Sequence, residues 1–316
     1  MRARFPARWV EQVEQRLSPM PSSNSPRALG RAWRALRGGC GEENGGEKGI
    51  LVIDMGSQNT RASMSAIPGS TVQGLSNEGL VATLVQNDMS KLDTPTAVAF
   101  RGGKCEVGEL AADQPASNAH NTIAYYMPHL GIDAQALAQH LINPAFTPAN
   151  SAPSSGTAAA LVHYKDEQIQ VPLELAAALQ VAAMAQYARA QIASQGGKAQ
   201  ASPSFQLVLA VPTYFNARQI KALQDASFIA GFDSPVLVSA AEALAHEYRV
   251  RHRRDLASLV NASTSGRRHV ALVDIGHASA SVAVVRYVLD AGAAGGVGAK
   301  VYMYILAAAA NVGAGA

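Results

Sequence analysis

Two stretches of this chain, 220 positions apart, carry the same order of chemically suggestive residues. "LVIDMGSQNT" and "LVDIGHASAS" each place an apolar run before an Asp, then an apolar residue, a Gly and small polar residues. Such a pattern predicts a strand, a tight turn and a second strand. Backbone N–H groups exposed in a turn of this kind attract phosphate oxygens without any side-chain charge.

The Asp at the end of each strand suggests a cation beside the phosphates. Mg²⁺ keeps much of its water shell and takes only one or two carboxylates from the protein. Two such hairpins facing one cleft would bind the phosphates of a nucleotide from both sides, so the sequence predicts a nucleotide with Mg²⁺ as the ligand. A single copy would be an ordinary hairpin, and the repeat favours the phosphate cleft. The predicted metal-side residues are Asp54 and Asp274, and the predicted phosphate-binding residues are Gly56, Ser57, Gln58, Asn59, Gly276, His277, Ala278 and Ser279.

The elements around these motifs alternate between strand and helix. The spacing predicts a hairpin from Gly49 with its turn at 56–59, and a second hairpin turn at Gly102 and Gly103. A helix is predicted from Pro172 to the residues before 196, then a buried strand at 205–212. Asn216 and Gln219 form a capping-box pattern for the next helix. A short strand at 234–239 and a helix at 240–250 follow, and this order is typical of an α/β layer.

Composition restricts the function further. The 316 residues are 48% hydrophobic and 16% charged, as in a folded protein of two domains. The net charge of +3 and the absence of a basic stripe with aromatics argue against nucleic acid as a partner, and no apolar run is long enough for a membrane span. Cys40 and Cys105 suggest neither a metal site nor a disulfide framework.

Three other regions carry weaker signals. Residues 1–48 are rich in Arg, Gly, Ser and Pro, which predicts a disordered extension or a mis-set start. Residues 251–269 are interpreted as a solvated loop, with a glycosylation sequon at Asn261. A flexible turn is predicted over 291–300.

Three motifs together resemble the nucleotide-binding domain of 70-kilodalton heat-shock chaperones. "VIDMGSQNT" looks like its first phosphate motif, "LAVPTYFNARQIKALQDASFIAGF" like the segment that forms the interlobe helix, and "LVDIGHASASVAVV" like its second phosphate motif. The resemblance implies an α/β fold of the actin-like ATPase (ribonuclease H-like) type, with ATP or ADP and Mg²⁺ as its ligands. It runs from Gly49 to Ala316 and covers only the first half of such a domain. The implied division is a first lobe at 49–267, with core 49–86 and 171–267 and an insert at 87–170, and a truncated second lobe at 268–316.

Within that superfamily the chain resembles the large divergent branch. "QNDMSKLDTPTAVAF" is similar to the 170-kilodalton glucose-regulated (hypoxia-up-regulated) chaperones, and "VDIGH" is also similar to the cytosolic 110-kilodalton type. The resemblance implies a stress-response chaperone that holds unfolded clients and acts as nucleotide-exchange partner of a 70-kilodalton chaperone. It implies the endoplasmic reticulum lumen, although no secretory signal is readable in this sequence, and the cytoplasm is the alternative.

The family's hydrolytic residues are only partly matched. Met127 stands where the family has a Lys that orients water, Ala240 where it has a Glu, and Ser281 where it has a further carboxylate. His277 and Ala278 replace Gly, and a Cβ at these positions would restrict positive φ. The catalytic residues therefore stay unassigned, hydrolysis is expected to be impaired, and a weak ATPase is left open. The alternatives are a truncated pseudo-domain that serves as an interaction module without nucleotide, and a sugar kinase, whose catalytic Asp we cannot identify.

Overall fold

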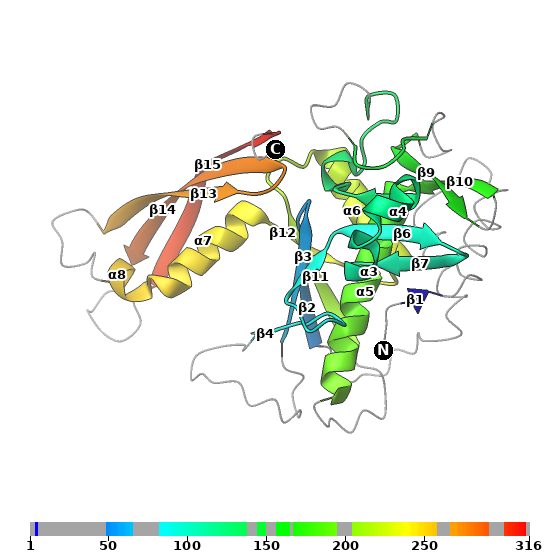
Figure 1. The fold of residues 1–316 in the computed structure, drawn as a ribbon. Helices are drawn as coiled ribbons and strands as arrows, with labels where there is room; N and C mark the ends of the chain where they lie inside the picture. The colour runs from blue at the N-terminus through cyan, green and yellow to red at the C-terminus, as the bar shows by residue number, and fades with distance from the viewer. Residues whose placement is uncertain are drawn as a thin grey trace. The chain divides into compact units, whose positions relative to one another are not determined.

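The computed structural model describes residues 4–5, 49–65, 82–137, 144–149, 156–164, 167–194, 204–257, 266–290 and 300–313. The chain divides into two compact units, one of residues 1–209 and 216–236 and the other of 210–215 and 237–316 (Figure 1). The lobe boundaries expected from the sequence stay a prediction. Because the placement of the two units is not determined, each is described by itself.

The first unit is built on a sheet around the first Asp–Gly motif. Strand β2 (Gly49–Met55) lies between β11 (Phe205–Val211) and β3 (Asn59–Ser65), and β3 also pairs with β4 (Ala82–Leu84) and β5 (Asp93–Pro95). Side chains of β2 alternate, so that Leu51, Ile53 and Met55 are buried and Asp54 is exposed. This is the period expected of a half-buried strand.

Two long helices pack together beside this sheet. They are α5 (Leu173–Ser194) and α6 (Ala217–Ile229), and Figure 1 shows α5 alongside β2 and β3. Helix α5 is buried along most of its length, which its many alanines permit because they let neighbouring backbones approach closely. The predicted capping box of α6 is confirmed: the Asn216 side chain accepts from the N–H of Gln219 at 3.1 Å, and the Gln219 side chain accepts from the N–H of Asn216 at 3.1 Å.

A smaller sheet and several short elements complete the first unit. The sheet has the order β1 (Arg4–Phe5), β7 (Lys104–Val107), β6 (Ala97–Arg101) and β8 (Thr122–Ala124). The short elements are α3 (Glu109–Ala112), α4 (Pro115–Asn118), η1 (Ala119–Asn121), η2 (Met127–His129) and the hairpin of β9 (Ala159–Tyr164) with β10 (Glu167–Pro172). The hairpin turn predicted at Gly102 and Gly103 is confirmed between β6 and β7. Burial raises the pKa of the Cys105 thiol on β7, which disfavours its reactive thiolate.

The second unit contains a three-stranded antiparallel sheet with a helix on one face. Strand β12 (Val236–Ser239) leads into α7 (Ala240–Arg251) and α8 (Arg253–Ala257), and the sheet has the order β13 (Arg267–Ile275), β14 (Ser279–Asp290) and β15 (Lys300–Val312). Its core joins the helices to β14, and the Tyr287 hydroxyl donates to the Ala245 carbonyl at 2.8 Å. The buried members of this core are Ala241, Ala245, Leu256, Ala283, Val285 and Tyr287.

Three details differ from the sequence-based expectations. Helix α5 begins at Leu173, because Pro172 is the last residue of β10. The segment 251–269, interpreted as a loop, contains the end of α7, helix α8 and the start of β13. Two residues of the predicted disordered extension, Arg4 and Phe5, pair with β7. The rest of 1–48, the Asn261 sequon and the turn at 291–299 lie outside the described residues.

None of the helices in the described part of the chain is long and apolar enough to cross a membrane.

Candidate functional site

The turn between β2 and β3 is closed tightly at Gly56. The Gly56 N–H donates to the Asn59 carbonyl at 3.0 Å, and the strands pair so that Asp54 lies opposite Arg61 and Met55 opposite Thr60. In the described part of the chain, the N–H groups of Ser57 and Gln58 donate to no acceptor. Unused N–H groups at the tip of a turn are the donors that a phosphate oxygen requires.

Gly56 is required by close approach and not by its backbone angle. A Cβ at this position would lie 2.8 Å from the Asn59 carbonyl oxygen, too close for any side chain. Glycine at this position therefore allows the turn to close this tightly, and the closed turn presents the N–H groups of Ser57 and Gln58 that a phosphate would need. The chain's predicted metal ligand, Asp54, is exposed two residues before it.

Thr96, the residue that follows β5, makes hydrogen bonds to this turn. The Thr96 N–H donates to the Gln58 carbonyl at 2.9 Å, and the Thr96 hydroxyl donates to the Gly56 carbonyl at 2.9 Å. The same hydroxyl lies 2.9 Å from the hydroxyl of Thr60, and both threonines are buried. The turn is thus bonded at two of its carbonyls by one residue that follows β5.

Charged side chains form a row across three strands next to the turn. Asp54 on β2 lies opposite Arg61 on β3, and Arg61 lies opposite Asp93 on β5. Arg61 forms an ion pair with Asp93, which holds the pKa of the Asp93 carboxyl below its usual range, first by hydrogen bonding and then by charge. The pKa of Arg61 is raised by Asp93 and, more weakly, by the charge of Asp54. A fixed cation therefore lies beside the carboxylate predicted to face Mg²⁺.

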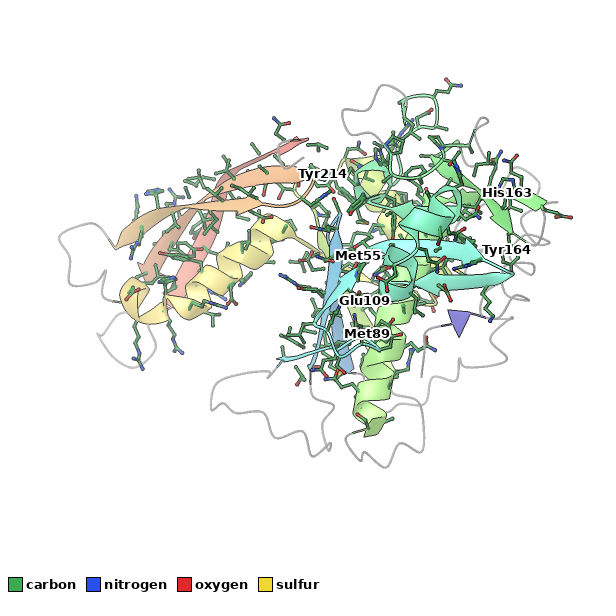
Figure 2. The ribbon with its side chains drawn as sticks, in the orientation of Figure 1. Met55, Met89, Glu109, His163, Tyr164 and Tyr214 are labelled. Carbon is green, nitrogen blue, oxygen red and sulfur yellow. The ribbon has the colours of Figure 1, made fainter. Side chains whose placement is uncertain are left out.

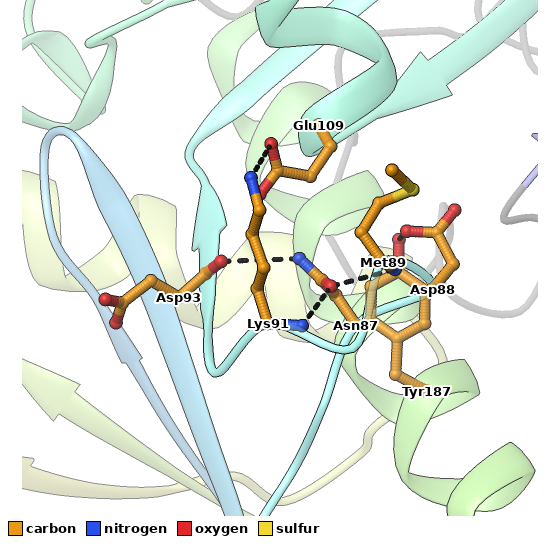
Figure 3. Close-up of polar contacts among 7 residues, drawn as sticks. All are labelled: Asn87, Asp88, Met89, Lys91, Asp93, Glu109 and Tyr187. Carbon is orange, nitrogen blue, oxygen red and sulfur yellow. Dashed lines mark hydrogen bonds and ion pairs between the residues drawn. The ribbon is translucent and has the colours of Figure 1, made fainter.

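The loop before β5 is ordered by one buried asparagine (Figure 3). The Asn87 side-chain oxygen accepts from the N–H groups of Met89 at 3.0 Å and Lys91 at 2.9 Å, and its amide donates to the Asp93 carbonyl at 3.3 Å. Lys91 forms a 3.1 Å ion pair with Glu109. These contacts fix the path of the chain into β5 and so toward Thr96.

The turn between β13 and β14 closes in the same way. The Gly276 N–H donates to the Ser279 carbonyl at 2.8 Å, and Asp274 lies opposite Ser281. A Cβ at Gly276 would lie 3.5 Å from the Ser279 oxygen, which is an ordinary contact. The turn-tip carbonyl of Ala278 accepts from the Gly313 N–H at 2.7 Å. Neither His277, which is exposed, nor Ala278, which is buried, has positive φ, so the expected conflict between a Cβ and the backbone does not arise.

The three positions that depart from the family's hydrolytic residues lie in different environments. Met127 is fully buried at the start of η2, and Pro128 beside it accepts from the Gln219 side-chain amide at 3.2 Å. Ala240 is the first residue of α7, and Ser281 is half-buried opposite Asp274. None of these side chains can carry charge at neutral pH. Among the described residues no group of three or more His, Cys, Asp or Glu side chains could hold a metal ion.

Sequence reasoning missed Thr96 and Arg61. Arg61 was readable from the hairpin alone, because a turn closed from residue 56 to 59 places 54 opposite 61. Thr96 was not, because its contact with the turn spans 40 positions and depends on the pairing of β5 with β3. Met55, which ends β2 and is labelled in Figure 2, is buried as the strand period predicts.

The structure has two strand–turn–strand units, each with an Asp two residues before a turn closed at glycine, which is the pattern from which the sequence predicts phosphate binding. The family model described as "Hsp70 protein" matches residues 53–293. The chain belongs to the Hsp70 family. For the nucleotide-binding domain of that family, membership implies the actin-like ATPase fold, with which the mixed α/β architecture agrees. At the family level, Hsp70 proteins are chaperones that bind ATP or ADP with Mg²⁺.

Individual relatives are distant. The chain is 27% identical over 224 residues to the human protein named "Putative heat shock 70 kDa protein 7", an alignment that covers 69% of this chain and 54% of that protein. It is 26% identical over 207 residues to a heat shock 70 kDa protein of Emericella nidulans, covering 64% of this chain and 28% of the relative. It is 26% identical over 211 residues to the chaperone protein DnaK of Halobacterium salinarum, an alignment that covers 67% of this chain and 26% of that protein. The chain thus spans about half of the human relative and about a quarter of the others.

Proposed function

We propose that this chain binds Mg-ATP or Mg-ADP as the nucleotide-binding part of a molecular chaperone. The observation that carries the proposal is the tightly closed Gly56 turn, where, among the described residues, the N–H groups of Ser57 and Gln58 donate to no acceptor. When bound, Mg²⁺ would neutralise phosphate charge. Asp54 is the carboxylate beside this turn that would face it, and the N–H groups of the turn would bind phosphate oxygens. The roles of Asp274 and the Gly276 turn stay predictions from the sequence repeat.

We further propose that the chain hydrolyses ATP slowly compared with ordinary 70-kilodalton chaperones. Phosphoryl transfer depends on positioning and on stabilising charge. Met127 is buried and cannot donate a hydrogen bond, and a hydroxyl stands opposite Asp274 where the resemblance expects a carboxylate. By the resemblance, these are positions where the family has charged hydrolytic residues, and the Gly56 turn is intact, so we expect turnover to be reduced more than affinity.

The large 170-kilodalton type of chaperone is the branch that we propose. The residues that resemble it have distinct structural roles: Asn87 orders the loop, Lys91 pairs with Glu109, and Pro95 belongs to the strand beside the turn. By that resemblance the whole protein would hold unfolded clients and promote nucleotide exchange on a 70-kilodalton partner, in the endoplasmic reticulum lumen.

Calorimetric titration of the full chain with Mg-ADP and Mg-ATP, with a matched series in EDTA, tests binding. We expect Mg-dependent binding and an ATP turnover far below that of an ordinary 70-kilodalton chaperone measured in parallel. A folded chain that binds neither nucleotide would contradict the proposal and favour the interaction-module alternative. Binding with ordinary turnover would contradict only the impaired hydrolysis.

The chaperone role has its own measurement. Two assays test it: suppression of aggregation of a heat-denatured client, and release of fluorescent ADP from a 70-kilodalton chaperone. If the longest natural chain that contains this sequence shows neither effect, that result would contradict the branch assignment.

A further inference from the structure

The residue after β5, Thr96, is held against the candidate phosphate turn by hydrogen bonds from both its backbone and its side chain. Thr96 is 1% exposed and makes three contacts there: its N–H to the Gln58 carbonyl at 2.9 Å, its hydroxyl to the Gly56 carbonyl at 2.9 Å, and its hydroxyl with that of Thr60 at 2.9 Å. A hydroxyl has one proton. Since the Thr96 proton goes to the Gly56 carbonyl, Thr60 must be the donor to Thr96.

These hydrogen bonds are made to carbonyl groups of the turn. In a planar peptide unit the C=O and the N–H point in opposite directions, so fixing the carbonyl also fixes the N–H. Holding the Gly56 carbonyl fixes the peptide plane whose N–H belongs to Ser57, and holding the Gln58 carbonyl fixes the plane whose N–H belongs to Asn59. Thr96 therefore sets the direction of the Ser57 N–H, a candidate phosphate donor that it does not itself touch, while its bond to the Gln58 carbonyl holds the turn closed at its other end.

Thr96 is in turn anchored by one face of α5. Gln180, Tyr187 and Gln191 follow one another at spacings of seven and four, which places them on the same side of the helix. The Gln180 amide donates to the Pro95 carbonyl at 3.1 Å, and the Tyr187 hydroxyl donates to Asp88 at 3.4 Å. The Gln191 side chain accepts from the Gln86 N–H at 2.9 Å and donates to the Leu84 carbonyl at 3.1 Å. Residues 84–96 are thus fixed along their length, with Thr96 at the end that meets the turn.

We propose that Thr96 is a positioning residue of the candidate phosphate turn: its hydroxyl orients the Ser57 N–H through the Gly56 carbonyl, and its own N–H holds the turn through the Gln58 carbonyl. The inference rests on the proposed nucleotide binding. It assigns to Thr96 no contact with the nucleotide and no part in proton transfer.

The test compares Thr96→Val, which removes the hydroxyl at nearly constant shape, with Thr96→Ser, which keeps it. Thr94→Val is the matched control, because Thr94, on β5 two residues before Thr96, is also buried and, among the described residues, its hydroxyl has no bond to the turn. Calorimetry should show Mg-ADP affinity falling about tenfold in Thr96→Val and staying within about threefold of the original protein in Thr96→Ser and Thr94→Val.

A second readout needs no nucleotide. Hydrogen exchange of the Gly56 and Thr96 amides should be faster in Thr96→Val than in Thr96→Ser, with global unfolding measured alongside. Equal affinity and equal exchange in Thr96→Val and the original protein would overturn the inference. If the original protein binds no nucleotide, the proposed function fails, and unchanged exchange in Thr96→Val would show separately that Thr96 does not hold the turn.

Discussion

The β2–β3 turn and the β13–β14 turn share one backbone design. In each, glycine donates to the carbonyl three residues on, at 3.0 Å from Gly56 and at 2.8 Å from Gly276. In each, the carbonyl two residues after that glycine accepts from the residue that follows the end of a third strand: Thr96 to Gln58 at 2.9 Å, and Gly313 to Ala278 at 2.7 Å. The internal repeat of the sequence is therefore a repeat of hydrogen bonds across three strands.

The side chains around the two turns differ sharply. Thr96 adds hydroxyl bonds to the first turn, whereas Gly313 has no side chain to offer the second. The first turn stands beside the row Asp54, Arg61 and Asp93, and the second beside Asp274, Ser281 and Ala310. A repeated backbone frame thus carries specialised side chains in one copy only, and three experiments measure what that specialisation does.

The largest effect is expected from adding one methyl group to each turn glycine. In Gly56→Ala the new Cβ would lie 2.8 Å from the Asn59 oxygen, so the turn must open. We expect a loss of about 1–3 kcal/mol in the free energy of unfolding, from forcing an atom into a packed site, and a fall in Mg-ADP affinity of more than about tenfold. Urea unfolding and calorimetry measure the two quantities.

Gly276→Ala is the matched variant, because its Cβ finds the Ser279 oxygen at 3.5 Å and Gly276 has no positive φ. Its stability and affinity should stay close to those of the original protein. Equal losses in the two variants would show that the difference in turn geometry has no functional consequence.

An intermediate effect is expected from neutralising each predicted metal-side carboxylate. Arg61 already places a cation beside Asp54, whereas the residue opposite Asp274 is Ser281. The measured quantity is the ratio of ADP affinity with Mg²⁺ to ADP affinity without it, obtained from titrations of ADP at several Mg²⁺ concentrations. We expect this ratio to fall about tenfold in Asp274→Asn and about threefold in Asp54→Asn, because the charge of Asp54 is already partly neutralised by Arg61. A larger effect from Asp54→Asn would refute this division of roles.

Sequence patterns predicted the backbone frame better than its side-chain supports. Periods of two and a glycine two residues after Asp were enough to predict both hairpins, and Asn216 with Gln219 was enough to predict the start of α6. These are local signals, because the residues that define each turn and the helix cap lie close together in the sequence. The Thr96 contacts, the α5 face and the difference between 2.8 and 3.5 Å at the two glycines depend on which distant strands pair and how closely they approach. The helix α8 was missed because "RRDLA" is short and its polar residues also suit a loop.

The smallest effect concerns the ion pair of Arg61 with Asp93, which only the first copy of the repeat has. Asp93 has a lowered pKa in the folded protein, so its pairing stabilises the fold above the ordinary aspartate pKa of about 3.9, and this stabilisation is lost as pH falls through the lowered value. Both side chains are substantially exposed, so solvent screens the pair and Arg61→Gln should cost less than about 1 kcal/mol near neutral pH. The cost should shrink toward zero in acid, where the original protein has also lost the pair.

Ser281→Ala, at the matching position opposite Asp274, removes no charge and should give a difference from the original protein that does not vary with pH. Urea unfolding across a pH series measures both variants. A pH-independent cost for Arg61→Gln would mean that the guanidinium stabilises β3 by packing its stem rather than by pairing its charge, and the two copies of the repeat would then differ in shape and not in electrostatics.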